Sequence, residues 1–209
     1  MVRIAVTLLW LVATVSATAD EPRYLFVQGD RVEYQSDADR TAWDLQGWYG
    51  GDLHKLWLKI EGKNEPQQDN ELQLLYSRAV SPYFDLQFGL RAHEVAGSST
   101  ASGVFGVQGL AAYKIEIDAA VFFTVDGDVE FRGEFERDFR LAQRVVMQPR
   151  IELNASSTAA DDAAVELRLR YEISRKLAPY VGVSWQRHFD DNLPDNTSSN
   201  FVAGLRFWF

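Results

Sequence analysis

A strict alternation of apolar and charged residues constrains the fold of this chain more than any other feature. Residues 164–173 read AVELRLRYEI, and residues 114–125 and 128–139 repeat the pattern as KIEIDAAVFFTV and DVEFRGEFERDF. A period of two is typical of β-strands whose two faces meet different surroundings. So many charges on one face cannot form the core of a water-soluble sandwich, because buried charges need partners. The apolar face is therefore the one that must leave water.

The alternation predicts about twelve strands. Their expected ranges are 25–35, 41–49, 53–62, 70–80, 83–95, 103–113, 114–125, 128–139, 143–155, 164–174, 178–189 and 200–209. Pro149 falls inside one of them and predicts a bulge, because proline cannot donate a ladder hydrogen bond. The chain has no cysteine, which excludes disulfides and thiolate metal sites.

The connections between these strands alternate in length. Those after odd-numbered strands are mostly long and polar, as in AGSSTASG and DDNLPDNTSS, and those after even-numbered strands are short, as in GGD, SP, RLAQ and RKLA. Outer-membrane barrels have short periplasmic turns, long extracellular loops and an even number of strands. We therefore expect an all-β fold, an up-and-down antiparallel transmembrane β-barrel of about 12 strands. A soluble secreted sandwich or barrel is the alternative.

The two faces of the expected barrel can be assigned by parity, since the sheet must close in a bilayer that satisfies no backbone group. The lipid face is expected to include Leu56, Leu58, Ile60, Leu86, Phe88, Leu90, Val145, Met147, Ile151, Leu153, Val181 and Val183. The lumen is expected to carry Lys55, Lys59, Glu61, Glu71, Asp85, Gln87, Arg91, Glu116, Asp118, Glu130, Arg132, Arg150, Glu152, Glu166, Arg168, Arg170, Glu172 and Arg206. Cross-strand ion pairs are expected to fill much of this narrow interior.

Aromatic residues gather near the short-turn end, where an interfacial girdle is expected. They are Trp48, Tyr49, Tyr83, Phe84, Tyr113, Phe139, Tyr180, Phe207 and Trp208.

The N-terminus carries the features of a secretory signal. Arg3 precedes the apolar run IAVTLLWLVATV, and small residues at Ala17 and Ala19 come ahead of Asp20. We expect a signal peptide over residues 1–19 and a barrel domain over residues 20–209; an N-terminal membrane anchor is the alternative, although the run is short for a spanning helix. Cleavage would leave 20 basic and 30 acidic side chains. So acidic a chain is not expected to bind nucleic acid.

Several blocks of the sequence resemble one family. They are GGDLHKLWLKIEG at 50–62, LQLLYSRAVSPYFDLQFGLR at 72–91, GVQGLAAYKIEIDAAVF at 106–122, QPRIELN at 148–154, LRLRYEISRKLAPYVGVSW at 167–185 and FVAGLRFWF at 201–209. Together they resemble the copper resistance protein B family of the bacterial outer membrane. The resemblance implies a monomeric outer-membrane barrel that binds copper ions or passes them across the membrane. Members usually carry a Met- and His-rich segment ahead of the barrel, and this sequence departs from them there.

Histidine is the strongest candidate donor for a copper site, because copper(II) prefers imidazole with oxygen ligands; the acidic loops SDADR, VDGD and FDDNLPDNTSS are a weaker route to divalent cations. His93 and His188 have lumen parity near the loop end, whereas His54 lies at the turn end with lipid-side parity. Nearby carboxylates are those of Glu94, Asp190 and Asp191. A copper ion held by these histidines is one hypothesis, and the alternative for each is a pore-wall residue making one hydrogen bond, since no closely spaced histidine pair exists.

No catalytic residues are expected, and the chain is interpreted as a non-enzyme. Some small outer-membrane barrels are lipid hydrolases, but this sequence has no His-x-Ser pattern and no G-x-S-x-G motif. The second functional hypothesis is a small porin-like or structural barrel without a copper function.

The chain ends in NFVAGLRFWF, in which alternate residues from Phe201 to Phe209 share the lipid parity. This segment predicts the closing strand of the barrel. A terminal phenylalanine after alternating apolar residues also resembles the signal by which the outer-membrane assembly machinery recognises barrels. We therefore expect Phe209 to be needed for assembly in outer-membrane lipid.

Overall fold

The computed structural model describes residues 22–36, 40–64, 68–157, 161–189 and 196–209. The expected signal peptide and the predicted ligands Asp190 and Asp191 lie outside these residues. No helix in the described ranges is long and apolar enough to cross a membrane.

The described residues form one antiparallel sheet of thirteen strands. The strands are β1 (Tyr24–Gln35), β2 (Arg40–Gly50), β3 (His54–Asn64), β4 (Asp69–Ala79), β5 (Phe84–Val95), β6 (Ser98–Ala111), β7 (Ile115–Thr124), β8 (Val129–Glu136), β9 (Phe139–Ala142), β10 (Val145–Ser156), β11 (Asp161–Tyr171), β12 (Leu177–Phe189) and β13 (Asn196–Trp208); a 3₁₀ turn, η1 (Ala112–Lys114), joins β6 to β7. Both β8 and β9 pair with β10 and fill one position, so the strands occupy twelve positions. The prediction of about twelve strands is confirmed.

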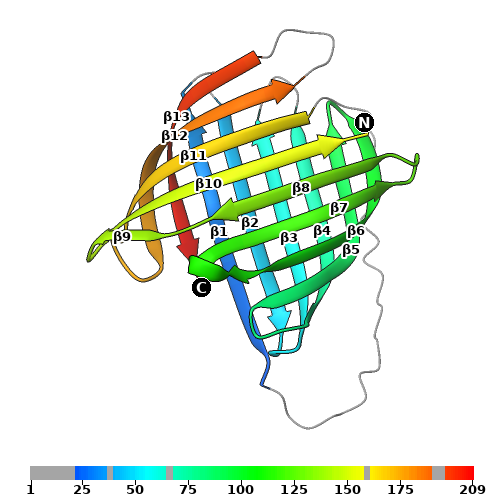
Figure 1. Ribbon diagram of the computed structural model, residues 1–209, viewed down its shortest axis with the longest axis horizontal. Helices are drawn as coiled ribbons and strands as arrows, with labels where there is room; N and C mark the ends of the chain where they lie inside the picture. Colours follow the sequence, from blue (N-terminus) through cyan, green and yellow to red (C-terminus); the bar gives the residue numbers. More distant parts are fainter. Residues whose placement is uncertain (1–21, 37–39, 65–67, 158–160, 190–195) are drawn as a thin grey trace.

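The sheet closes on itself between its first and last strands (Figure 1). At this seam the Val27 amide donates to the Phe209 carbonyl at 3.0 Å, and the Phe209 amide donates to the Val27 carbonyl at 2.8 Å. Closure leaves no free edge along the spanning strands, which a bilayer requires because its hydrocarbon offers no hydrogen bonds; the short β9 pairs only with β10. The terminal aromatic segment is therefore the closing strand, as the alternation predicted.

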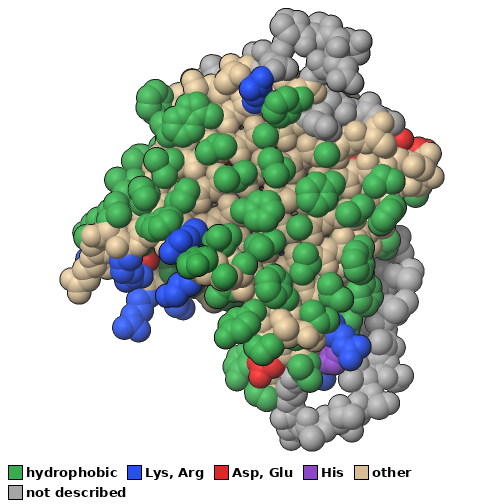
Figure 2. Space-filling view, viewed as in Figure 1, with side chains coloured by type: hydrophobic (Ala, Val, Ile, Leu, Met, Phe, Trp, Pro, Cys, Tyr) green, Lys and Arg blue, Asp and Glu red, His purple; other side chains and the backbone are tan. Residues whose placement is uncertain are grey.

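Hydrophobic side chains cover the outer surface of the barrel (Figure 2). Leu90 is 69% exposed and Phe201 is 73% exposed, whereas Arg150 and Arg168 are among the most buried side chains of the chain. This inverted distribution is the opposite of that in a water-soluble protein, in which arginine is almost never fully buried. The assignment of the apolar face to lipid and of the charged face to the lumen is confirmed.

One predicted loop is a tight turn. The segment AGSSTASG was expected to be a long loop, but β5 and β6 remain paired up to Val95 and Ser98. Between them Ala96 and Gly97 both have positive φ, 52° and 82°. Positive φ at both central residues is typical of a type I′ hairpin, whose twist matches that of the strands. The small polar residues that suggested a loop are therefore the first residues of β6.

The predicted bulge at Pro149 is wrong, because β10 pairs with β11 in continuous register through this residue. The irregularity lies in the strand on its other side, which breaks between Glu136 and Phe139. Proline has no amide hydrogen to donate there, while its carbonyl accepts from the Arg137 amide at 3.2 Å. The missing donor is therefore accommodated by interrupting the neighbouring strand.

A bulge occurs instead in β1, where the register with β2 shifts between Gly29 and Arg31. The extra residue breaks the alternation, so Asp30 and Arg31 both line the lumen. After the bulge, Val32 is exposed and Glu33 is buried.

The predicted aromatic girdle is correct for some residues and wrong for others. Tyr49, Tyr83 and Tyr113 are exposed at the short-turn end. Tyr180 is instead buried in the lumen, where its hydroxyl donates to Glu33 at 2.8 Å. Trp48 also lies inside, packed against an apolar lumenal cluster of Trp57, Leu75, Val104 and Phe122. Proximity to a turn did not show whether Trp48 and Tyr180 face the lumen or the lipid, because apolar residues occur on both faces of β2 and β12.

Candidate functional site in the barrel lumen

The lumen contains two larger cavities of similar size and a third, of about 50 Å³, between them. The cavity at the loop end has a volume of about 550 Å³ and the cavity at the turn end about 520 Å³. The two have no lining residue in common. Ion pairs connect their walls: Arg31 lies 3.7 Å from Asp44, and Arg150 lies 3.5 Å from Glu152. A layer of charged side chains therefore fills much of the space between the two larger cavities, and the smaller cavity lies within this layer, sharing Glu61 and Arg132 with one and Asp44 and Asp118 with the other.

One part of this layer is built around Arg168 on β11. Its guanidinium lies 2.6 Å from Glu166, 3.3 Å from Glu33 and 3.9 Å from Asp30, and it also lies over the Tyr180 ring at 5.1 Å. Each of these charged side chains is at most 8% exposed. Charges removed from water so completely persist only when several opposite charges and hydrogen bonds surround them.

A second part lies on the opposite wall, formed by β4, β5 and β8. Glu71 accepts from Arg132 at 3.0 Å and lies 2.9 Å from Arg91, which also contacts Glu130 at 2.6 Å. The guanidinium of Arg91 lies 4.1 Å from the centroid of the Phe122 ring, within the range of a cation–π interaction. Aromatic and ionic contacts together hold this arginine against the barrel wall.

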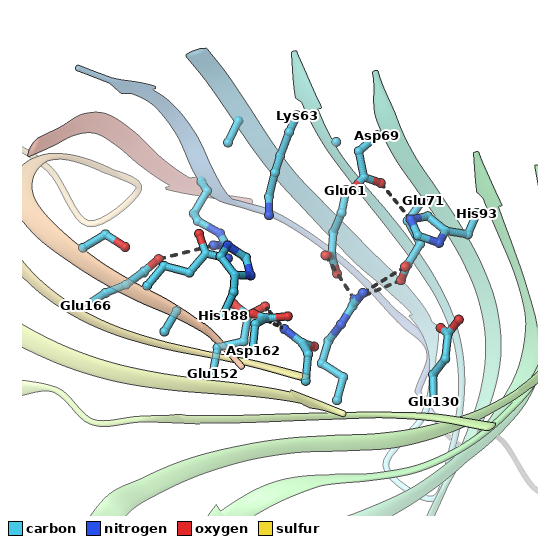
Figure 3. A pocket seen from close by; sticks show the side chains of 18 of the residues that line it. Glu61, Lys63, Asp69, Glu71, His93, Glu130, Glu152, Asp162, Glu166 and His188 are labelled. Atoms are coloured by element: carbon cyan, nitrogen blue, oxygen red, sulfur yellow. Dashed lines mark hydrogen bonds and ion pairs between the residues drawn. The ribbon is translucent and has the colours of Figure 1, made fainter. Parts of the chain in front are cut away.

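His93 lines the loop-end cavity and has two polar partners (Figure 3). Its Nε2 lies 2.7 Å from Oδ1 of Asp69, and its Nδ1 lies 2.8 Å from Nη2 of Arg91. A guanidinium can only donate, so Nδ1 must be the acceptor and Nε2 must carry the hydrogen given to Asp69. This tautomer is assigned from the partners. A metal bound at Nε2 would displace that proton and find the Asp69 carboxylate beside it.

The predicted partner Glu94 is not the carboxylate that contacts His93. Glu94 is the next residue along β5, and successive side chains of a strand point to opposite faces. Asp69, which does make the contact, lies on the neighbouring strand β4.

His188 lines the same cavity from another wall, as its parity predicted (Figure 3). It pairs across β11 and β12 with Asp162. The Asp162 carboxylate accepts from Asn154 at 3.2 Å, and the same amide donates to Glu152 at 3.0 Å. The second histidine is thus adjacent to a row of oxygen ligands.

His54 is separated from this cavity. It lies at the turn end of β3, exposed, where its Nδ1 forms a hydrogen bond with the Tyr76 hydroxyl and its ring stacks on the Tyr76 ring. Its position agrees with the lipid-side parity that made it the weakest of the three candidates.

The described residues contain no cluster of three or more His, Asp or Glu side chains arranged to hold a metal ion. The loop-end cavity is nevertheless acidic, since seven carboxylates and five cationic side chains line it. The turn-end cavity has seven carboxylates and two arginines. Both halves of the lumen therefore favour cations over anions electrostatically.

Sequence reasoning missed several lumenal charges. Arg31 and Glu33 were absent from the predicted set because the β1 bulge changes the parity within one strand, and Asp30, also absent, lies at the bulge itself. Asp69 was missed as the partner of His93 because the two belong to different strands, 24 residues apart. Pairing β4 with β5 by their shared pattern would have placed Asp69 within reach.

Comparison with known proteins finds one family model and curated sequences that are similar to this chain. A family model described as copper resistance protein B precursor matches residues 23–209. The copper resistance protein B homolog of Pseudomonas syringae pv. tomato is 34% identical over 202 residues, which cover 86% of this chain and 68% of that protein. Copper resistance protein B of Escherichia coli is 34% identical over 200 residues, with the same coverage.

Solved structures with a similar fold are outer-membrane barrels. The NanC porin has a TM-score of 0.57 at 13% identity, and the KdgM porin 0.55 at 13%; each match covers 88% of this chain and 99% of the porin. Outer membrane phospholipase A from Escherichia coli has a TM-score of 0.55 at 11% identity, covering 90% of both chains. At these identities the likeness is one of fold only.

Proposed function

This chain belongs to the copper resistance protein B family and has the fold of an outer-membrane barrel, and on that premise we propose that it contributes to copper tolerance by binding copper(II) in the loop-end cavity of its lumen. The observation that carries the proposal is the presence of His93 and His188 on the walls of one acidic cavity, each beside a carboxylate. Imidazole and carboxylate are ligands suited to copper(II), and the chain has no thiolate to favour copper(I).

The arrangement of the lumen favours holding the ion over passing it. An ion that enters from the loop end meets the layer formed by Arg31, Arg150 and Arg168 before it reaches the turn-end cavity. Passage would require these side chains to move and so would separate buried ion pairs, in which carboxylates such as Asp44, Glu152 and Glu166 balance the guanidinium charges. The proposed role is therefore retention of copper near the outer surface of the membrane.

Replacing His93 or His188 by alanine is expected to weaken copper(II) binding to the refolded barrel. We expect each substitution to lower the copper(II) affinity by about tenfold or more. Losing a group that only supports a metal ligand already costs about tenfold or more, so losing the ligand itself is expected to cost at least as much. Isothermal titration with copper(II), in detergent and at constant pH, measures the effect.

His54→Ala is the matched control, because this histidine lies outside the lumen. It is expected to leave the affinity unchanged. Equal losses in all three variants would indicate binding by surface imidazoles, and an unchanged affinity in His93→Ala and His188→Ala would remove the lumenal site.

A porin-like or structural barrel without a copper function is the second candidate. It is favoured by the similarity to porin structures and by the lack of a three-ligand cluster in the described residues. The two candidate functions predict different growth on added copper for a strain that lacks the gene. Under the copper proposal this strain loses tolerance to added copper, and the wild-type gene restores it while the His93→Ala, His188→Ala gene does not. Unchanged tolerance in the deletion strain would leave the porin-like function.

We propose a non-enzymatic role. The copper resistance family and the porin-like neighbours support it. The fold shared with a phospholipase does not argue against it, because that likeness is at 11% identity.

A further inference from the structure

The short turns at one end of the barrel carry basic residues, although the whole chain is acidic. The two residues between β8 and β9, the β9–β10 turn and the β11–β12 turn contribute Arg137, Arg144, Arg175 and Lys176. We call these four residues the basic rim. The formal charge of the chain is −9, so four cations gathered at one end of the barrel are a local departure from its composition, although Asp138 and Glu172 lie near them.

Carboxylates close to the basic rim are already paired with other cations. Asp138 lies 2.5 Å from Arg170, and Glu172 lies 3.7 Å from Arg140. Among the described residues, no carboxylate forms an ion pair with a member of the basic rim. Arg144, Arg175 and Lys176 are exposed to solvent, and Arg137 is partly exposed. Four cations are therefore available to a ligand from outside the chain.

Backbone hydrogen bonds hold the basic rim together. The Glu172 amide donates to the Arg144 carbonyl at 2.8 Å, which joins the β9–β10 turn to the end of β11. The Trp208 amide donates to the Lys176 carbonyl at 3.2 Å, which joins the β11–β12 turn to β13. The turns thus form one continuous stretch of the barrel end, and cationic side chains gather there beside the apolar outer surface (Figure 2).

Two members of the basic rim lie over aromatic rings. The Arg137 guanidinium is 4.4 Å from the centroid of the Phe139 ring, and the Lys176 ammonium is 5.1 Å from that of Phe209. Phe209 is 65% exposed at the end of the closing strand. Aromatic rings at the end of the apolar surface mark the boundary between hydrocarbon and head groups. The cations are therefore at the depth of the lipid phosphates.

We propose that the basic rim binds the phosphate groups of phospholipids in the periplasmic leaflet of the outer membrane. Short turns face the periplasm in barrels of this class, so this leaflet is the one in contact. Arginine and lysine both bind phosphate, arginine through paired hydrogen bonds. Contact with lipid-facing rings selects a phosphate that is attached to acyl chains over one free in solution. The rim anchors the barrel at a fixed depth and holds the β8–β9 interruption against the head groups.

Binding of phosphatidylglycerol to the purified full-length barrel, measured by native mass spectrometry from detergent, tests the proposal. Removing the charge of Arg137 and of Lys176 by substitution with glutamine is expected to weaken binding by about fivefold for each charge. Arg137→Lys keeps the charge and is expected to retain most of the affinity.

The matched control is Arg187→Gln, because Arg187 also lies over an aromatic ring, 5.1 Å from Phe189, at the opposite end of the barrel. Equal effects of Arg137→Gln and Arg187→Gln would overturn the proposal in favour of general charge attraction. Diacylglycerol, which lacks the phosphate, is expected to bind more weakly than phosphatidylglycerol, and equal binding would also overturn it. Displacement of the lipid by equimolar inorganic phosphate would show a site for free anions instead.

Discussion

A chain that ends at Trp208 is expected to reach the outer membrane in much smaller amounts than the full chain. Deleting Phe209 removes both backbone hydrogen bonds that it exchanges with Val27 at the seam of the barrel. It also removes the ring that packs 6.1 Å from Phe207 and lies under Lys176. An unpaired position at the seam exposes backbone groups that hydrocarbon cannot satisfy. The folded fraction in isolated outer membranes, resolved by heat-modifiable gel mobility, measures the loss.

Two variants separate the causes of this effect. Phe209→Tyr keeps the backbone bonds and a terminal aromatic ring, so it is expected to assemble nearly as well as wild type. Phe201→Ala removes a large lipid-facing side chain from the middle of β13 and is expected to have a smaller effect than the truncation. If the truncated chain refolds normally in detergent but not in cells, the defect lies in recognition by the assembly machinery. Normal assembly of the truncated chain in cells would contradict the role given to Phe209.

The fold could be predicted because a transmembrane barrel imposes one rule on nearly every strand. Outward residues meet lipid and inward residues meet charges or water, so alternation persists from β3 to the closing strand. The predicted lipid-facing residues Leu56, Phe88 and Val181 are exposed in the structure. The period-two alternation alone was enough to assign these residues to the lipid face, since each strand shows the same alternation independently.

Several of the failed predictions concern positions where the alternation is broken or hidden. The β1 bulge reverses the parity of Glu33, and no residue type in that segment marks it. Trp48 and Tyr180 have the sequence positions of interfacial aromatics but face inward. Trp48 packs against the apolar lumenal cluster, and the Tyr180 hydroxyl donates to Glu33. Such choices depend on the neighbouring strands, which no single strand's sequence reveals.

The candidate site was predictable in part for the same reason. Parity placed His93 and His188 in the lumen, and the structure brings both to one cavity. The carboxylate beside His93 depends on the pairing of β4 with β5, which alternation does not specify. The two halves of the lumen, with the ion-pair layer between them, depend on long side chains that cross the barrel, as in the contact of Arg31 with Glu166 at 3.8 Å.

Replacing Arg168 by glutamine is expected to lower the free energy of unfolding by about 3–5 kcal/mol, the usual effect of removing one partner from a buried ion pair. Arg168 is the common partner of Glu33, Glu166 and Asp30, so the variant leaves several carboxylates close together with less positive charge. Glu33 is the most affected, because its side chain is completely buried. Urea unfolding of the refolded barrel in detergent, followed by tryptophan fluorescence, measures the change.

A triple variant with Arg168→Gln, Glu33→Gln and Glu166→Gln tests the physical reason. It removes one positive and two negative charges, and the glutamines retain hydrogen-bonding groups for the Tyr180 hydroxyl. Because the uncompensated carboxylates are then gone, the triple variant is expected to be more stable than Arg168→Gln. If it were less stable instead, Glu33 and Glu166 would contribute through partners other than Arg168, such as the contact of Glu166 with Arg31 at 3.8 Å. The two outcomes thus decide whether these carboxylates act mainly with Arg168 or mainly with their other partners.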